Sequence, residues 1–183
     1  MNAEYPAWKY YPPRQRPPGW VTDVVGVFAD VQTSIDSAVV LGTTSDAALA
    51  LLRPGLLGLG FDVEAGKKKA EKIRRPVLFG EMGSEDMAYE VDAFHSDLGI
   101  ALEVEAGRGA RGNAVYRDLI QTSLLVDAEY LVLAVAQAYR HKLKANVAGA
   151  VVQSYRDARR LLDAIYASAR LRLPLEGILL IGY

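Results

Sequence analysis

The sequence contains no cysteine and only two histidines, His95 and His141. Without cysteine the chain has no disulfide framework and no thiolate metal site, and two histidines exclude a histidine-rich zinc site. No apolar run approaches the roughly 18 residues that a membrane-spanning helix needs. Residues 1–20 also lack the apolar region of a secretory signal. These absences predict a cytoplasmic protein that does not enter a membrane.

Several signatures of enzyme classes are missing as well. The sequence has no GxSxG motif, no P-loop pattern and no cysteine nucleophile, so serine hydrolase, nucleoside triphosphatase and thiol chemistry lack support. The net charge of −1 gives no overall basic excess, but a nucleic-acid binder needs positive charge on one face rather than in total. The 51% hydrophobic content predicts a globular protein with a substantial core.

A length of 183 residues suits one domain with an added arm. Residues 1–20 hold five prolines among several aromatic residues. Because proline cannot donate a backbone hydrogen bond, this stretch is predicted to be an extended arm, with its aromatics on the domain surface or on a partner subunit. Residues 21–183 are predicted to form a single α/β domain.

The rest of the chain alternates between helical and strand-like patterns. Apolar periodicity predicts helices over 22–37, 46–53 (ended by Pro54), 113–127 and 154–169, and strands over 60–64, 130–138 and 175–183. In helix 113–127 we expect four apolar side chains to face inward: Tyr116, Leu119, Ile120 and Leu124. The order of elements predicts a mixed central sheet flanked by helices.

Two short alternating runs, residues 88–95 and 100–105, flank a turn at residues 96–99, which predicts a β-hairpin. Side chains of a strand alternate between its faces. The hairpin therefore presents four carboxylates on one face, two from each strand: Glu90, Asp92, Glu103 and Glu105.

The pairing register decides whether these carboxylates meet. If Ser96 pairs with Gly99, Asp92 lies opposite Glu103 with Cβ atoms roughly 4.5–5.5 Å apart, and the other two carboxylates also face each other. Like charges so placed destabilise a sheet, which indicates a divalent cation; Mg²⁺ is usually held by one or two carboxylates with waters and phosphate oxygens. Two alternatives stay open: an exposed acidic hairpin without a ligand, and a bulge at Gly99 that shifts the register by one residue.

Asp92, ten intervening residues and then Glu103-Val104-Glu105, followed by a helix and an apolar strand, resemble the PD-(D/E)xK nuclease superfamily. The family carries Asp on one strand and (D/E)-x-K on the next. Glu105 occupies the lysine position here, as in a minority of type II restriction endonucleases. The resemblance extends over residues 45–183 and implies a restriction-endonuclease-like α/β fold with an αβββαβ core.

The resemblance also implies a function, namely a metal-dependent endodeoxyribonuclease that hydrolyses duplex DNA as a homodimer. Asp92 and Glu103 would hold Mg²⁺ or Mn²⁺, and the backbone carbonyl of Val104 would join the metal shell. Glu105 would bind a second metal or accept the proton of the attacking water. Three further carboxylates are candidate assisting residues: Glu90, Glu64 and Glu81.

Three basic segments are candidates for contacts to DNA phosphates. They are the run before the hairpin, the loop after it, and the end of strand 130–138. Their residues are Lys67, Lys68, Lys69, Lys72, Arg74, Arg75, Arg108, Arg111, Arg140 and Lys142. We expect these segments to surround one cleft with the carboxylates; for the first run, a solvated charged face is the alternative.

Two other functions stay open. The chain could be a catalytically inactive nuclease-fold protein that binds nucleic acid, or a protein-assembly module whose acidic face meets a basic partner. Metal binding through Asp92 and Glu103 separates a nuclease from an assembly module, and DNA cleavage separates it from an inactive binder. A linked methyltransferase is a possible partner that the sequence does not show, and an adjacent methyltransferase gene would favour a restriction role.

Overall fold

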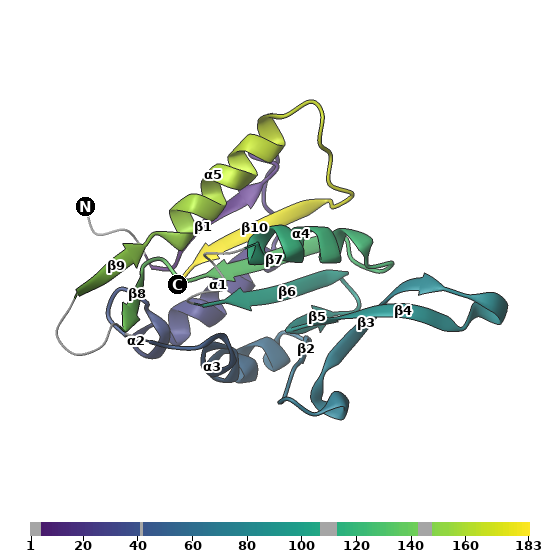
Figure 1. The fold of residues 1–183 in the computed structure, drawn as a ribbon, viewed down its shortest axis with the longest axis horizontal. Helices are drawn as coiled ribbons and strands as arrows, with labels where there is room; N and C mark the ends of the chain where they lie inside the picture. The colour runs from purple at the N-terminus through teal and green to yellow at the C-terminus, as the bar shows by residue number, and fades with distance from the viewer. Residues whose placement is uncertain (1–4, 41, 107–112, 143–147) are drawn as a thin grey trace.

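The computed structural model describes residues 5–40, 42–106, 113–142 and 148–183. Its centre is a six-stranded mixed sheet with the strand order β1-β10-β7-β6-β5-β2, covered by helices on both faces (Figure 1). Three adjacent strands run parallel: β6 (Ile100–Glu105), β7 (Tyr130–Val135) and β10 (Gly177–Gly182). The prediction of a mixed sheet flanked by helices is confirmed.

The remaining strands of the sheet are antiparallel to their neighbours. β5 (Ala93–His95) pairs with β6, and β2 (Asp62–Val63) pairs with β5. At the opposite edge, β1 (Ala7–Tyr11) pairs with β10.

The parallel strands are apolar throughout because they are buried on both faces. On one face, Val132 of β7 joins a core formed with α1 (Trp20–Asp30), α2 (Gln32–Ile35) and α3 (Ser45–Gly58). On the other face, Leu131 and Leu133 join a core formed with α4 (Ala114–Leu124) and α5 (Ser154–Ala167). Strand alternation thus divides the apolar side chains between two helix layers.

The helices of the first layer differ from expectation in two places. The single helix predicted over 22–37 is divided into α1 and α2, and α3 continues through Pro54 instead of ending there. An interior proline costs a helix about 3 kcal/mol. Leu52 and Leu56 on either side of Pro54 are completely buried, and burial of each contributes about 1.5–3 kcal/mol, which offsets that cost.

The N-terminal arm is extended as predicted, but residues 7–11 form the edge strand β1. Tyr10 packs into the first core and Tyr11 into the second, so these two aromatics lie deeper than the expected position on the domain surface, whereas Trp8 is 44% exposed. Pro6 and Pro12 flank the strand, as expected for an edge position where no ladder bond is lost.

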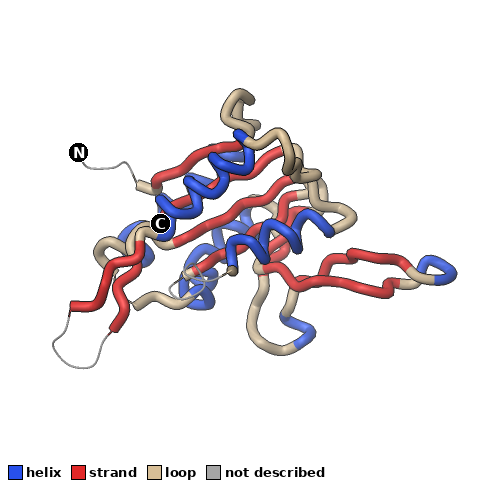
Figure 2. Tube along the Cα trace, turned by 45° about the horizontal axis from the view of Figure 1, so that its top comes forward, coloured by secondary structure: helices blue, strands red, loops and turns tan. Residues whose placement is uncertain are grey.

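Two hairpins lie outside the central sheet. β3 (Ile73–Phe79) and β4 (Glu85–Val91) form one, which projects from the sheet in two views (Figures 1 and 2). β8 (Tyr139–Lys142) and β9 (Ala148–Val152) form the other, which the sequence did not predict. Two 3₁₀ turns, η1 (Lys69–Glu71) and η2 (Glu81–Gly83), lie before β3 and at the tip of the first hairpin. Within the described ranges, no helix is long and apolar enough to cross a membrane.

Candidate active site: a carboxylate cavity beside β6

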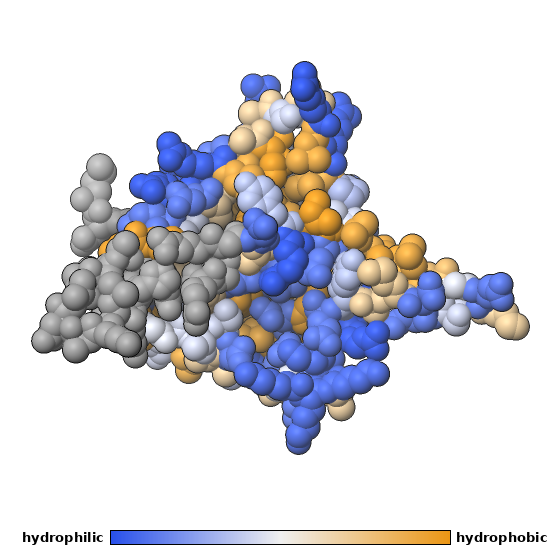
Figure 3. Space-filling view, in the orientation of Figure 1, coloured by the Kyte–Doolittle hydropathy of each residue, from blue (hydrophilic) through white to orange (hydrophobic). Residues whose placement is uncertain are grey.

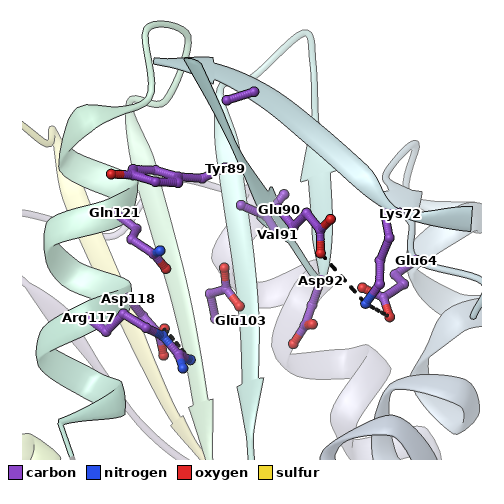
Figure 4. Close-up of a pocket in the computed structure, with 11 residues that line it drawn as sticks. Glu64, Lys72, Tyr89, Glu90, Val91, Asp92, Glu103, Arg117, Asp118 and Gln121 are labelled. Atoms are coloured by element: carbon purple, nitrogen blue, oxygen red, sulfur yellow. Dashed lines mark hydrogen bonds and ion pairs between the residues drawn. The ribbon is translucent and has the colours of Figure 1, made fainter. Parts of the chain in front are cut away.

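A polar cavity of about 580 Å³ lies between β6, α4 and the point where β4 bends into β5 (Figure 4). Its charged lining comprises five carboxylates and two basic side chains: Glu64, Glu90, Asp92, Glu103, Asp118, Lys72 and Arg117. Figure 3, drawn in the orientation of Figure 1, shows hydrophilic residues in the middle of the face toward the viewer. Apolar residues lie beside them toward the β3–β4 hairpin.

The register of β5 and β6 places Asp92 beside Glu103. The ladder begins with Ala93 opposite Leu102, which is the unshifted register, and continuing it by one residue brings Asp92 beside Glu103. Gly99 ends the intervening turn at φ +61°, and a Cβ there would lie 2.8 Å from a backbone oxygen. Glycine is favoured at such a position because L side chains rarely adopt it, and this turn keeps the register unshifted.

Asp92 lies between β4 and β5, where the chain changes its pairing partner. β4 pairs with β3, and β5 pairs with β6. Its Oδ2 accepts a 2.8 Å hydrogen bond from the backbone N–H of Val104. Burial raises the pKa of Asp92 to about 6, although this hydrogen bond opposes the shift. The backbone carbonyl of Asp92 also accepts a 2.8 Å bond from the N–H of Glu64, which brings the Glu64 side chain to the same cavity.

Glu103 and Glu105 lie on the same face of β6 and are both partly buried. Burial, then the nearby charges of Asp92 and Asp118, raise the pKa of Glu103 well above its usual range. Burial also raises the pKa of Glu105 to about 7, with Asp118 adding to the shift and Arg117 opposing it. The cavity therefore concentrates more negative charge than its own cations balance.

The prediction for Glu90 is wrong in one respect. Glu90 lies opposite Arg74 of β3, and Glu105 lies beside Val135 of β7, so the two glutamates do not face each other. The reason is the bend at Asp92, where the strand leaves the β3 hairpin and joins the sheet. Glu90 still lines the cavity, whereas Glu81 lies in η2 at the hairpin tip, outside the lining.

Helix α4 supplies the part of the site that the sequence did not predict. Of the four side chains expected to face inward, only Leu119 is buried; the other three, Tyr116, Ile120 and Leu124, are 54%, 54% and 47% exposed. The helix instead turns Asp118 inward, where it is 1% exposed. Arg117 and Gln121 complete the α4 side of the cavity.

Arg117 links Glu105 to Asp118. Its Nη2 donates to Glu105 Oε1 at 2.7 Å and to Asp118 Oδ1 at 2.9 Å, and its Nε donates to Asp118 Oδ1 at 3.0 Å. Asp118 Oδ2 is buried and has no hydrogen-bond partner among the described residues. The carboxyl pKa of Asp118 is raised by burial, with Arg117 opposing the shift.

The basic run 67–75 does not line one cleft as a unit. Lys72 alone lines the cavity, where its Nζ lies 2.6 Å from Glu64 Oε1 and 4.0 Å from Glu90 Oε2. The other described ion pairs of the run lead away from the cavity: Lys67 to Asp46 at 3.4 Å, Arg74 to Glu85 at 3.2 Å and Arg75 to Asp127 at 2.7 Å. Lys68 and Lys69 are exposed.

The other two basic segments cannot be placed at the cavity. Arg108 and Arg111 lie outside the described residues. Arg140 and Lys142 lie in β8, of which only the backbone is described.

No known family, curated protein or solved structure was found to match this chain. Its function is therefore inferred from the geometry of the cavity.

In the part of the chain that the structure describes, no group of three His, Asp or Glu side chains converges as a metal site. Mg²⁺ usually takes only one or two carboxylates and completes its octahedron with water and phosphate oxygens, and Asp92 and Glu103 are the two carboxylates that the predicted site offers. A cation at this pair would need a ligand that brings oxygen atoms of its own.

Proposed function

We propose that this chain is a metal-dependent endodeoxyribonuclease of the PD-(D/E)xK type and that the carboxylate cavity is its active site. The observation that carries the proposal is that Asp92, directly before β5, and Glu103, on the antiparallel neighbour β6, both line one cavity. Burying two carboxylates without a counter-charge is unfavourable and raises their pKa values. A divalent cation between them would remove that cost.

The order of the elements supports the proposal. Helix α3 precedes strands β2, β5 and β6 of the central sheet, which are successively antiparallel, with the β3–β4 hairpin inserted between β2 and β5; α4 then leads to β7, which is parallel to β6. This order fits an αβββαβ core of the restriction-endonuclease type.

The residues around the pair suit phosphodiester hydrolysis. Asp92 has one carboxylate oxygen engaged by Val104 N–H and a second oxygen for a cation. In a strand, the N–H and C=O of one residue point toward the same neighbour, so the Val104 carbonyl would also face Asp92. Mg²⁺, or Mn²⁺, would lower the pKa of a bound water and neutralise charge on the phosphate. Glu64, beside Asp92, would assist in holding that water or the cation.

Homodimerisation is part of the same proposal, and it is supported by the outer face of α4. Tyr116, Ile120 and Leu124 are spaced by four residues and are each about half exposed, so they form one apolar stripe along the helix. A two-fold symmetric interface brings the same patch of two copies together. Two copies joined by α4 could act on both strands of duplex DNA.

A nuclease-fold protein that binds nucleic acid without cutting, or serves as an assembly module, is the second candidate. It is favoured by Glu105, a carboxylate where the family usually carries lysine. The nuclease and the binder differ in cleavage alone, so one assay separates them.

The test is incubation of supercoiled plasmid with the purified chain and Mg²⁺ or Mn²⁺, with RNA in parallel. Nicking and linearisation are expected for the wild type, and loss of both for Asp92→Asn and Glu103→Gln, because the cation loses a charged ligand. Without metal, both variants should bind DNA at least as well as wild type, since repulsion of phosphate falls.

Glu81→Gln is the matched control, because it neutralises an exposed carboxylate outside the cavity; it should cut like wild type. Wild type that binds DNA but cuts nothing would favour the second candidate. Cleavage by Asp92→Asn at the wild-type rate would refute the site assignment.

A further inference from the structure

The cavity is short of positive charge for the reaction proposed for it. Five carboxylates and two basic side chains line it, and cleavage of a phosphodiester adds negative charge as the transition state forms. Cationic groups fixed near that charge are often the largest contribution to catalysis. The two candidates among the lining residues are Lys72 and Arg117.

Lys72 is already engaged. Its ammonium lies 2.6 Å from Glu64 and 4.0 Å from Glu90, and its side chain is 22% exposed. Hydrogen bonding to Glu64 is the main cause that raises its pKa. Lys72 therefore neutralises carboxylates of the cavity wall. Because its ammonium is already paired with them, it is poorly placed to bind a ligand.

Arg117 is placed differently. Its side chain is 56% exposed and lines the cavity from α4, opposite the strands that carry the acidic pair. Nε and Nη2 donate to Glu105 and Asp118, whereas Nη1 donates no hydrogen bond to any described residue. A guanidinium carries five N–H donors in a rigid fork that matches phosphate oxygens, so one edge of Arg117 is held while another can receive a ligand.

We propose that Arg117 contacts the scissile phosphate and that Glu105 and Asp118 hold its guanidinium in position for that contact. This inference rests on the proposed function, because it places the phosphate in the same cavity. Glu105 is then a positioning residue, in contrast to the metal-binding or proton-accepting role that the resemblance implies.

The buried state of Asp118 supports this division of roles. A carboxylate that is 1% exposed is costly unless it is paired, and the paired oxygen of Asp118 receives both Nε and Nη2 of Arg117. Charge-assisted bonds of this kind fix an arginine in one orientation. Because Arg117 and Asp118 are consecutive on α4, their pairing holds the Arg117 guanidinium close to the helix. The bond to Glu105 then connects the guanidinium to β6, the strand that carries Glu103.

The experiment measures single-turnover cleavage of a duplex oligonucleotide with Mg²⁺, beside DNA affinity in a chelator. Arg117→Ala should lower the cleavage rate by about 100-fold or more, the size found when one fixed donor to a transition state is removed. Arg117→Lys should recover part of that loss, since it keeps charge without the fork. Affinity without metal should change by less than about threefold, because one phosphate contact contributes little to overall DNA binding.

Arg156→Ala is the matched control. Arg156 lies on α5, is 57% exposed and pairs at 3.2 Å with the next residue, Asp157, as Arg117 pairs with Asp118. It should cut and bind like wild type.

Two further variants test the positioning role of Glu105. Glu105→Gln should lower the cleavage rate while leaving the half-saturating Mg²⁺ concentration within about threefold of wild type; a metal ligand would instead raise that concentration by tenfold or more. The exchange Glu105→Lys with Arg117→Glu keeps the ion pair and moves the cation to β6, and should cut faster than either single variant.

The outcomes separate this inference from the proposed function. If wild type cuts no nucleic acid with either metal, both fail. If wild type cuts and folded Arg117→Ala and Arg117→Lys cut equally well, only the role of Arg117 is overturned. A large rise in the Mg²⁺ requirement of Glu105→Gln would make Glu105 a metal ligand and overturn its positioning role. Should Arg117→Ala fail to fold by circular dichroism, Arg117→Gln and the exchange variant decide the question.

Discussion

At the scale of single residues, the cavity makes stability depend on pH. The pKa of Asp92 is raised to about 6 and that of Glu105 to about 7, chiefly by burial. In the unfolded chain the pKa values of these carboxyls are about 4. Between these values the folded chain binds more protons than the unfolded chain, so the free energy of unfolding falls as pH rises through this window.

The first prediction follows for the protein in a chelator. The contribution of these carboxyls should be present in full below about pH 4, fall as pH rises and be lost at about pH 8. Asp92→Asn should therefore raise the melting temperature most at about pH 8 and less at about pH 5, because the folded chain carries the aspartate charge in full only at the higher pH. Mg²⁺ should stabilise wild type at about pH 8 more than it stabilises Asp92→Asn.

Differential scanning fluorimetry at the two pH values measures these shifts, with Glu81→Gln as the control that should follow wild type. A variant Asp92→Asn that is destabilised at about pH 8, with metal absent, would show that the aspartate charge is satisfied by the protein itself.

The sequence predicted the acidic pair better than the rest of the site. Asp92 and Glu103 could be placed opposite each other because strand alternation and a turn closed by Gly99 are local properties. The partner of Glu90 could not be predicted, since the alternating pattern continues unchanged through residues 88–95 while the strand changes partner at Asp92. Long-range pairing of β4 with β3 decides that change.

At the scale of elements, α4 shows why the α4 side of the site was missed. Two faces of this helix carry apolar side chains. The larger ones lie on the face that is exposed in the structure: Tyr116, Ile120 and Leu124. The buried stripe has Val115 and Leu119 together with Asp118 and Thr122. Apolar periodicity selects the more hydrophobic face, but the sheet beside α4 presents carboxylates and a cavity, so the mixed stripe is the complementary one.

The exposed stripe of α4 leads to the second prediction. If it joins two copies, Ile120→Glu should convert a dimer into a monomer, because a symmetric interface would place two like charges near each other at its centre. The melting temperature at a concentration where wild type is already monomeric should change little, since Ile120 is 54% exposed. Sedimentation velocity over a concentration series measures the change.

Val39→Glu is the control for that variant, because Val39 is an exposed apolar residue, at 76%, in another part of the chain. It should leave the dimer intact. A wild-type chain that sediments as a monomer at every concentration would remove the homodimer from the proposed function.

At the scale of the whole molecule, the order of layers could be predicted while the N-terminal edge strand could not. The near-continuous apolar run of β7 and the strongly periodic α5 indicated a buried strand and a covering helix. The N-terminal edge strand β1 was missed because its proline-rich surroundings are typical of an arm. Its pairing partner, β10, lies at the other end of the chain, and no local pattern reports a contact over that separation.

The last prediction concerns how a chain with a net charge of −1 binds duplex DNA. Affinity must then come from basic residues gathered on one side, and the exposed Lys67, Lys68 and Lys69 lie between β2, at the edge of the central sheet, and β3. Each phosphate contact releases condensed counterions, so the logarithm of the binding constant falls with the logarithm of salt concentration by about 0.9 per contact. Replacing the three lysines together with glutamine should make the slope shallower by about 2 to 3.

Fluorescence anisotropy with a duplex at several salt concentrations, in a chelator, measures that slope. The matched control replaces three exposed arginines of α5 with glutamine: Arg156, Arg159 and Arg160. Because α5 packs against β1 and β10, at the opposite edge of the sheet from β5 and β2, this control should leave the slope unchanged although it removes the same charge. Equal changes of slope in both variants would mean that DNA affinity depends on the total charge of the chain alone. An unchanged slope in the lysine variant would exclude residues 67–69 from the interface.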